Sequence, residues 1–126
     1  MTMINPLARV RGLGSAKEGT HHWIAQRMTA VALIPLMIWF VFSLTCILGS
    51  DLAAVKAWIG SPFNAVLTIL MLVAGFHHAQ LGLQVVIEDY VHGHGCKIAL
   101  LWFVKGAAIF FAVAAVFSVV KLAIGV

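Results

Sequence analysis

Charged residues are scarce in this sequence: its 126 residues include eight Lys and Arg and only four Asp and Glu. Ordinary soluble domains have about 25% charged and roughly 45–50% apolar residues, whereas here the two fractions are 10% and 63%. A soluble core of this size could not hide so much apolar surface. The shortage of charge therefore excludes a soluble globular domain and predicts an integral membrane protein.

The sequence also lacks the common motifs of metal-binding, nucleic-acid-binding and catalytic sites. The two cysteines, Cys46 and Cys96, stand apart without the CxxC spacing of a metal site, and no disulfide is expected between them. No dense basic stripe interleaved with aromatic residues is present, which argues against nucleic-acid binding. The sequence also lacks a protease triad, a phosphate-binding glycine loop and a zinc motif. Any chemistry must therefore come from polar groups in or beside the apolar segments.

Three apolar stretches are each long enough to cross a membrane as a helix. The hydrocarbon core of a bilayer requires about 20 mostly apolar residues in helical form. The predicted spans cover roughly residues 24–48, 63–88 and 98–124, with a short interfacial helix at about 52–59. The sequence thus predicts an all-α integral membrane protein with three transmembrane helices and a single membrane-anchor domain, residues 1–126.

The flanks of these spans predict the orientation of the chain. Cytoplasmic flanks of membrane helices are enriched in Lys and Arg. Four basic residues precede the first span or lie near its start: Arg9, Arg11, Lys17 and Arg27. We therefore expect residues 1–22 to form a cytoplasmic arm. Three spans then place the loop at about 89–97 on the cytoplasmic side and the C-terminus on the outer, periplasmic side.

The N-terminal arm has some features of a targeting segment and lacks others. It has no apolar run behind its charges, so a secretory signal peptide is not predicted. Its Arg and Ser content leaves an organelle transit peptide as the alternative to a cytoplasmic arm.

The second predicted span carries an unusual set of polar residues within FHHAQLGLQVVIEDY, residues 76–90. At 100° per residue, four of them share one narrow arc of the helix: His77, Gln80, Gln84 and Glu88. His78 lies about 100° away from this polar stripe. Asp89 follows His78 by eleven residues, which returns to nearly the same azimuth about 16 Å farther along the axis. His78 and the Asp89–Tyr90 pair are therefore expected on a shared face, His78 deep in the membrane and the pair at its cytoplasmic boundary.

Small residues surround His78 in the sequence, and they leave two interpretations open. These residues are Ala74, Gly75, Ala79 and Gly82. They permit either the close approach of another helix or a flat cofactor beside the helix. A neutral imidazole in an apolar span suits axial haem ligation. His77 and His78 cannot both face the same partner, so at most one of them is a ligand.

The remaining polar residues have simpler interpretations beside functional ones. For Gln80 and Gln84, hydrogen bonding across a helix interface is favoured over function. His92 and His94 are expected to be solvated in the loop, with metal binding as the alternative. The phenol of Tyr90 could donate a hydrogen bond to a carbonyl oxygen, with the neighbouring carboxylate handling its proton.

Two segments resemble a known family, the hydrophobic membrane anchor subunits of succinate dehydrogenase. HAQLGLQVVIEDYV, residues 78–91, resembles the H-x(10)-D-Y pattern of that subunit, and GTHHWIAQRMTAVAL, residues 19–33, resembles its entry into the first span. The resemblance implies that His78 is an axial ligand of haem b. It implies that Tyr90 hydrogen-bonds a ubiquinone carbonyl and that Asp89 takes part in proton handling. Two further residues are implied to lie near the haem propionates: Arg27 and His21.

The resemblance also implies partners and a location. A companion cytochrome b anchor subunit would supply the second haem ligand, and an iron–sulfur subunit and an FAD-containing flavoprotein subunit would dock from the cytoplasm. Catalysis by this chain alone is not expected. The implied location is a bacterial inner membrane, with the mitochondrial inner membrane as the alternative, and a trimer of heterotetramers is compatible with it. Two other functions stay open: a haem-free anchor of a fumarate reductase-type complex, and a proton or solute conduit along the polar stripe.

Overall fold

The computed structural model describes residues 17–125, with side chains from residue 19 onward. These residues fold into four helices: α2 (Lys17–Ile47), α3 (Leu52–Gly60), α4 (Pro62–Tyr90) and α5 (His94–Ala123). The all-helical prediction is confirmed, and so is a short helix in the first connection. Residues 1–16 of the predicted arm lie outside the described residues, whereas residues 17–22 already belong to α2.

Three of the helices, α2, α4 and α5, are long and apolar enough to cross a membrane. Their number agrees with the prediction, but helical structure continues past the predicted spans. The predicted loop 89–97 narrows to residues 91–93, because the backbone N–H of Val91 still bonds Ile87 and that of Lys97 bonds the Gly93 carbonyl at 2.8 Å. Apolarity marks where a helix meets lipid, while backbone hydrogen bonding decides where the helix ends. The membrane boundaries along each helix stay a prediction.

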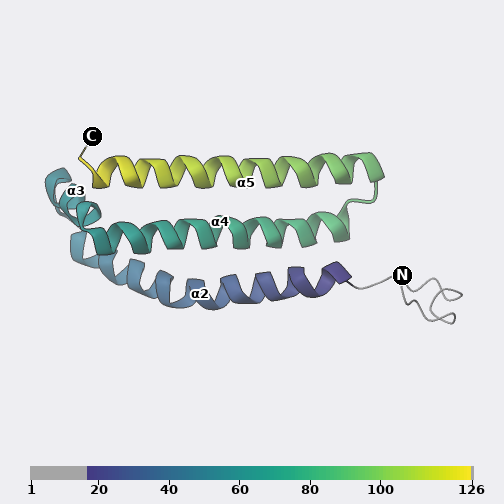
Figure 1. Cartoon of the computed structure of the whole chain (residues 1–126), viewed down its shortest axis with the longest axis horizontal. Helices are drawn as coiled ribbons and strands as arrows, with labels where there is room; N and C mark the ends of the chain where they lie inside the picture. Colours follow the sequence, from purple (N-terminus) through teal and green to yellow (C-terminus); the bar gives the residue numbers. More distant parts are fainter. Residues whose placement is uncertain (1–16, 126) are drawn as a thin grey trace, which may run out of the picture.

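Helix α4 lies between α2 and α5 and packs against both (Figure 1). Helix α3 sits at the end where α4 begins, and it contacts α4 and α5. Ile59, Ala65 and Val119 form a small buried cluster at this end. Trp58 of α3 stacks on Trp39 of α2 with ring centroids 5.8 Å apart. Aromatic and aliphatic contacts therefore join all four helices at the end opposite the α4–α5 turn.

Most large apolar side chains of the described residues point outward. The buried apolar residues are few: Ile59, Ala65, Leu81, Ile87 and Val119. Three helices in a row bury only a narrow stripe of each helix, so the other faces need a different cover. Exposed apolar surface of this extent marks contact with lipid or with other proteins.

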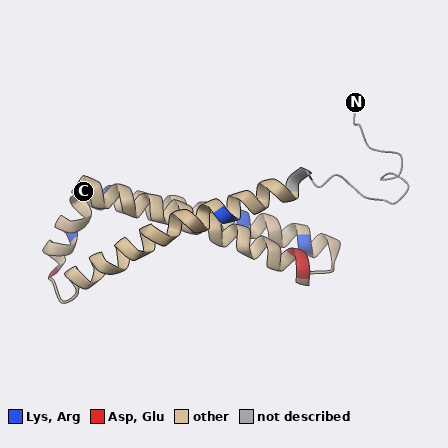
Figure 2. Ribbon diagram, turned by 90° about the horizontal axis from the view of Figure 1, so that it is seen from below, with Lys and Arg blue, Asp and Glu red and all other residues tan. Residues whose placement is uncertain are grey.

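Helix α2 is curved and crosses the α4–α5 layer obliquely (Figures 1 and 2). Pro35 lies inside it and lacks the backbone N–H that would continue the hydrogen-bond ladder. Membrane helices tolerate such residues because neighbouring groups satisfy the freed carbonyl. Among the described residues, one face of α2 meets α4, and Trp39 near its end contacts α3.

Candidate functional site

Two glycines of α4 face α2 on the side of the helix that also carries His78. A Cβ atom built on Gly75 would lie 3.9 Å from Leu33 Cδ2, and one built on Gly82 would lie 3.8 Å from Gln26 Nε2. These contacts run antiparallel along the two helices. Gly75 and Gly82 thus lie on the α4 face that packs against α2, and an added Cβ atom at either position would make an ordinary contact.

Between these two contacts, Thr29 of α2 meets His78 of α4. Thr29 Oγ1 lies 3.0 Å from His78 Nδ1. The same hydroxyl donates to the Ala25 carbonyl oxygen at 2.8 Å, with the Gln26 carbonyl oxygen at 3.1 Å. A hydroxyl has one proton but two lone pairs, so with its proton directed to the backbone, Oγ1 accepts from the Nδ1–H of His78. This tautomer leaves Nε2 of the half-buried ring with a free lone pair.

Two more polar atoms on this face of α2 are buried. His22 Nε2 and Gln26 Oε1 have no hydrogen-bond partner within the part of the chain that the structure describes. Residues 22, 26 and 29 follow the i, i+4, i+7 spacing of one helix face. A buried polar atom without a partner costs roughly 1–3 kcal/mol. A bound group or a partner chain that hydrogen-bonds these atoms would therefore stabilise the α2–α4 face.

Asp89 and Tyr90 lie at the end of α4, as the sequence predicts. A single uninterrupted helix joins His78 to Asp89 and Tyr90, so the eleven-residue spacing places His78 and Asp89 at nearly the same azimuth. Both Asp89 and Tyr90 are exposed, and 77% of the Tyr90 side chain's reference surface is accessible. The phenol and the carboxylate are free to meet a ligand or a partner at this end of the bundle.

Arg27 and His21 do not turn toward His78 within this chain. Arg27 precedes Thr29 by two residues, which separates their directions by about 200° around α2. The Arg27 guanidinium carbon lies 5.7 Å from the ring centroid of Trp23, within cation–π range. His21 is exposed. Both side chains lie on surfaces of α2 that α4 does not cover.

The predicted polar stripe of α4 is a chain of side-chain hydrogen bonds. Gln80 Nε2 donates to Gln84 Oε1 at 3.3 Å, and Gln84 Nε2 donates to Glu88 Oε1 at 2.8 Å. Lys97 Nζ donates to the Glu88 carbonyl oxygen at 2.7 Å. The glutamines were expected to bond across a helix interface, but they bond along their own helix at i, i+4 spacing. His77 lies at the deep end of this stripe and is exposed.

The other candidate ligands do not gather into a metal centre. Among the described residues, no three His, Cys, Asp or Glu side chains are grouped closely enough to hold a metal ion. His92 and His94 are exposed beside the α4–α5 turn, and Cys46 and Cys96 are free and exposed. A haem iron requires only one imidazole from a chain that shares it, so His78 is the candidate that fits.

Thr29 is the site residue that the sequence did not reveal. It lies within RMTA, yet no role was predicted for it, because a threonine in an apolar helix normally bonds its own backbone. Its spacing to His22, Gln26 and Leu33 marks one face of α2 and could have drawn attention to it. This spacing identifies one face of α2, but it does not predict that His78 lies opposite Thr29.

Comparisons with known proteins point to one family. A family model described as succinate dehydrogenase/fumarate reductase transmembrane subunit matches residues 1–120. The chain is 36% identical over 117 residues to a succinate dehydrogenase hydrophobic membrane anchor subunit of Paracoccus denitrificans, covering 87% of this chain and 90% of the relative. It is 33% identical over 100 residues to the subunit of the same name from Rickettsia conorii, covering 79% of each. It is 31% identical over 97 residues to a succinate dehydrogenase membrane anchor subunit of Reclinomonas americana, covering 74% of this chain and 80% of the relative.

Proposed function

The chain belongs to the succinate dehydrogenase/fumarate reductase transmembrane subunit family, and we propose that it is the haem-bearing anchor of a succinate:quinone oxidoreductase. The family resemblance drawn from residues 19–33 and 78–91 is thereby confirmed. In the proposed complex, succinate is oxidised at the FAD of a flavoprotein subunit, and electrons pass through an iron–sulfur subunit. This chain, with a companion cytochrome b anchor subunit, holds both at the membrane and helps to form the site of ubiquinone reduction.

The proposed orientation has the N-terminus in the cytoplasm and the C-terminus in the periplasm of a bacterial inner membrane. Three helices that can span a membrane put the two ends on opposite sides. The basic residues of the N-terminal arm favour the cytoplasm for that end. The α4–α5 turn, with Asp89 and Tyr90 beside it, then faces the cytoplasm, where the soluble subunits dock.

His78 carries the haem proposal through its 3.0 Å contact with Thr29. Its Nδ1–H is engaged by Thr29 Oγ1, so Nε2 offers the neutral lone pair that an axial haem ligand requires. A hydrogen bond on the opposite ring nitrogen is the usual device that orients a ligating histidine. Haem b supplies a one-electron store when bound. The companion subunit would supply the other protein ligand to the haem.

Arg27 and His21 are proposed to contact the haem propionates. A guanidinium can bond a carboxylate through two parallel hydrogen bonds. Arg27 lies on a face of α2 that α4 does not cover, so the propionate it meets would be held between this chain and its companion. The buried Nε2 of His22, on the α2 face toward α4, is a further polar group that could bond the haem or the companion subunit.

Tyr90 and Asp89 are proposed to serve the quinone. Reduction of a quinone to a quinol takes two electrons and two protons, one proton at each carbonyl oxygen. The exposed phenol of Tyr90 can donate a hydrogen bond to a carbonyl oxygen, and the adjacent Asp89 carboxylate can pass protons from water. Their place at the end of α4 beside the cytoplasmic turn gives both groups access to water.

An optical difference spectrum of the purified complex, reduced minus oxidised, tests the haem proposal. We expect a b-type α band in the native complex and its loss in His78→Ala. His77→Ala is the matched control, because that neighbouring imidazole lies about 100° from His78 around α4, and its band should persist. A native complex without the band, or an unchanged band in His78→Ala, would leave a haem-free anchor of the fumarate reductase type.

A further inference from the structure

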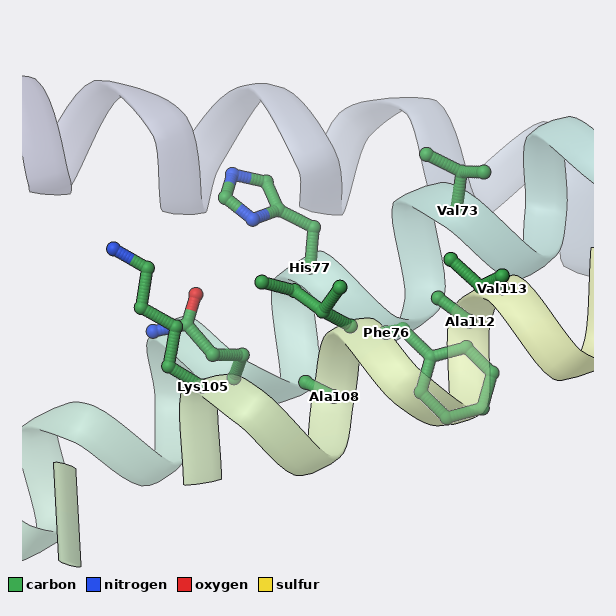
Figure 3. A pocket seen from close by; sticks show the side chains of 9 residues that line it. Val73, Phe76, His77, Lys105, Ala108, Ala112 and Val113 are labelled. Carbon is green, nitrogen blue, oxygen red and sulfur yellow. The ribbon is translucent and has the colours of Figure 1, made fainter. Parts of the chain in front are cut away.

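A groove between α4 and α5 lies outside the site just described. One part of this groove is a cavity of about 310 Å³, lined mainly by apolar side chains that include Val73, Phe76 and Val113. Figure 3 shows these apolar side chains at one end of the cavity and Lys105 and His77 at the other. The groove is therefore amphipathic along its length.

The polar end of this cavity continues into a second hollow of about 390 Å³. Gln80, His77 and Lys105 line both hollows, and Gln84 and Trp102 line only the second. Because Gln84 lies one helical turn closer to the end of α4 than Gln80, the second hollow leads toward the proposed cytoplasmic surface. The two hollows form one elongated groove, with the lysine near its middle.

Lys105 has no anionic partner in this groove. No acidic residue lines either hollow, and its Nζ lies 6.0 Å from the centroid of the Trp102 ring. In the part of the chain that the structure describes, acidic residues occur only at the ends of the bundle, whereas basic residues also occur between them (Figure 2). A lysine at membrane depth is costly unless it pairs with an anion or reaches the interface. The groove thus carries an uncompensated positive charge.

Lys105 lies within reach of the headgroup region. It follows the first residue of α5 by eleven positions, which corresponds to about 16 Å along the axis. Helix α5 has 30 residues, about 45 Å, which exceeds the hydrocarbon thickness of about 30 Å. Shared between the two ends, this excess would place the first turns of α5 in the headgroup layer, within the range toward which a long lysine side chain extends. An anion that meets Lys105 comes most directly from the lipid.

We propose that the α4–α5 groove binds one anionic phospholipid, with its phosphate at Lys105 and an acyl chain along Val73, Phe76 and Val113. Gln80 and His77 supply further hydrogen-bond donors beside the ammonium group. Charge complementarity selects an anionic headgroup, and the apolar remainder of the groove selects a chain rather than a small soluble anion. The site uses neither His78 nor Tyr90, so it does not depend on the haem or quinone proposals.

The test is native mass spectrometry of the whole complex, purified in mild detergent and exchanged into phosphatidylglycerol or phosphatidylcholine. We expect the native complex to retain one phosphatidylglycerol per copy of this chain. Lys105→Gln should lower that occupancy about fivefold, the ratio expected for one lysine at an anionic headgroup. Lys121→Gln is the matched control, an exposed lysine at the other end of α5, and should retain the lipid.

A second variant tests the apolar part of the groove. Ala112 lines the cavity, so Ala112→Phe fills it while the lysine is kept, and we expect the same loss of lipid. Quenching of Trp102 fluorescence, obtained by subtracting Trp102→Phe, should be greater with brominated phosphatidylglycerol than with brominated phosphatidylcholine.

Three results would overturn the proposal. Equal lipid retention in Lys105→Gln and the native complex would show that the lysine binds no headgroup. Retention in Ala112→Phe would show that no acyl chain lies in the groove. Loss of the companion subunit from Lys105→Gln would assign the missing anion to a partner carboxylate. The haem band is recorded on the same samples, so a failed haem proposal is told apart from a failed lipid site.

Discussion

Thr29 Oγ1 and His78 Nδ1 meet at 3.0 Å across the α2–α4 interface and join the two helices at the centre of the proposed haem site. The contact orients the imidazole and selects which of its nitrogens is free. Because Thr29 lies two residues after Arg27 on α2, one short segment supplies both the hydroxyl that holds the ligand and the guanidinium proposed for the propionates. Helix α2 is therefore part of the site, not only a neighbour of α4.

Replacing Thr29 by valine should weaken haem binding while preserving the shape of the helix interface. Loss of a hydrogen bond behind a ligating histidine commonly lowers metal affinity by roughly 10–100-fold. The ring also loses electron donation toward the iron, so the haem midpoint potential should rise. Haem-to-flavin ratios and a redox titration of the purified complex measure both effects.

Thr29→Ser is the control for this prediction, since serine keeps the hydroxyl and loses only a methyl group. It should restore the native haem content and potential. If valine and serine variants behave alike, the hydroxyl does not position His78, and Thr29 acts only through packing.

Tyr90→Phe should impair quinone reduction and spare succinate oxidation. A neutral hydrogen bond contributes about 1 kcal/mol net, so kcat/KM for ubiquinone should fall on the order of five- to tenfold. Succinate oxidation with a soluble dye bypasses the quinone and should stay at the native rate. Equal loss of both activities would indicate defective assembly instead of a lost contact.

Arg27→Ala should disturb the haem more than the docking of the soluble subunits. The guanidinium lies on the free surface of α2 beside Trp23, where it can meet a propionate of a haem shared with the companion subunit. We expect a shifted haem potential with the flavoprotein still bound. Arg27→Lys keeps the charge without the paired donors and should give an intermediate shift. A native spectrum and potential in Arg27→Ala would refute the propionate contact.

Gly75 should accept alanine but not leucine. A Cβ at Gly75 would make an ordinary contact with Leu33 at 3.9 Å, and alanine favours helix over glycine by about 1 kcal/mol. Leucine would force α2 and α4 apart, at a cost of roughly 1–3 kcal/mol. Thermal unfolding of the complex measures the difference.

A matched glycine is available on α5 for this experiment. No atom lies within 4 Å of a Cβ built on Gly106, so Gly106→Leu should not lower the melting temperature or the haem content. If Gly75→Leu and Gly106→Leu lower the melting temperature equally, the size of leucine anywhere in the bundle is the cause, not the Gly75–Leu33 contact.

Gln84→Leu should have little effect on turnover. It removes the hydrogen bonds to Gln80 and Glu88, and such bonds contribute on average about 0.6 kcal/mol in membrane helices. Even if both bonds, together about 1.2 kcal/mol, counted fully toward turnover, quinone reduction would stay within about eightfold of the native rate. A loss beyond tenfold in an assembled, haem-replete complex would revive proton conduction along the stripe.

Several features of this protein follow from local sequence alone. The scarcity of charge requires lipid around the chain, and the lengths of the apolar runs predict three spanning helices. The common azimuth of His78 and Asp89 follows from counting residues along one helix. Likewise, the polar stripe from Gln80 to Glu88 needs only the i, i+4 spacing. These properties depend on hydrogen bonds and side chains within one helix, so neighbouring sequence determines them.

The partners of those faces depended on the tertiary structure. Thr29 meets His78, and Lys105 lies beside His77, across separations in sequence that no periodicity predicts. The direction of Arg27, away from His78, became evident only once one face of α2 was placed against α4. Which residues meet between two helices depends on their crossing, register and relative rotation, and these are set by packing along the whole contact. The sequence determines which side chains lie on each face of a helix, and helix packing determines which residues those side chains contact.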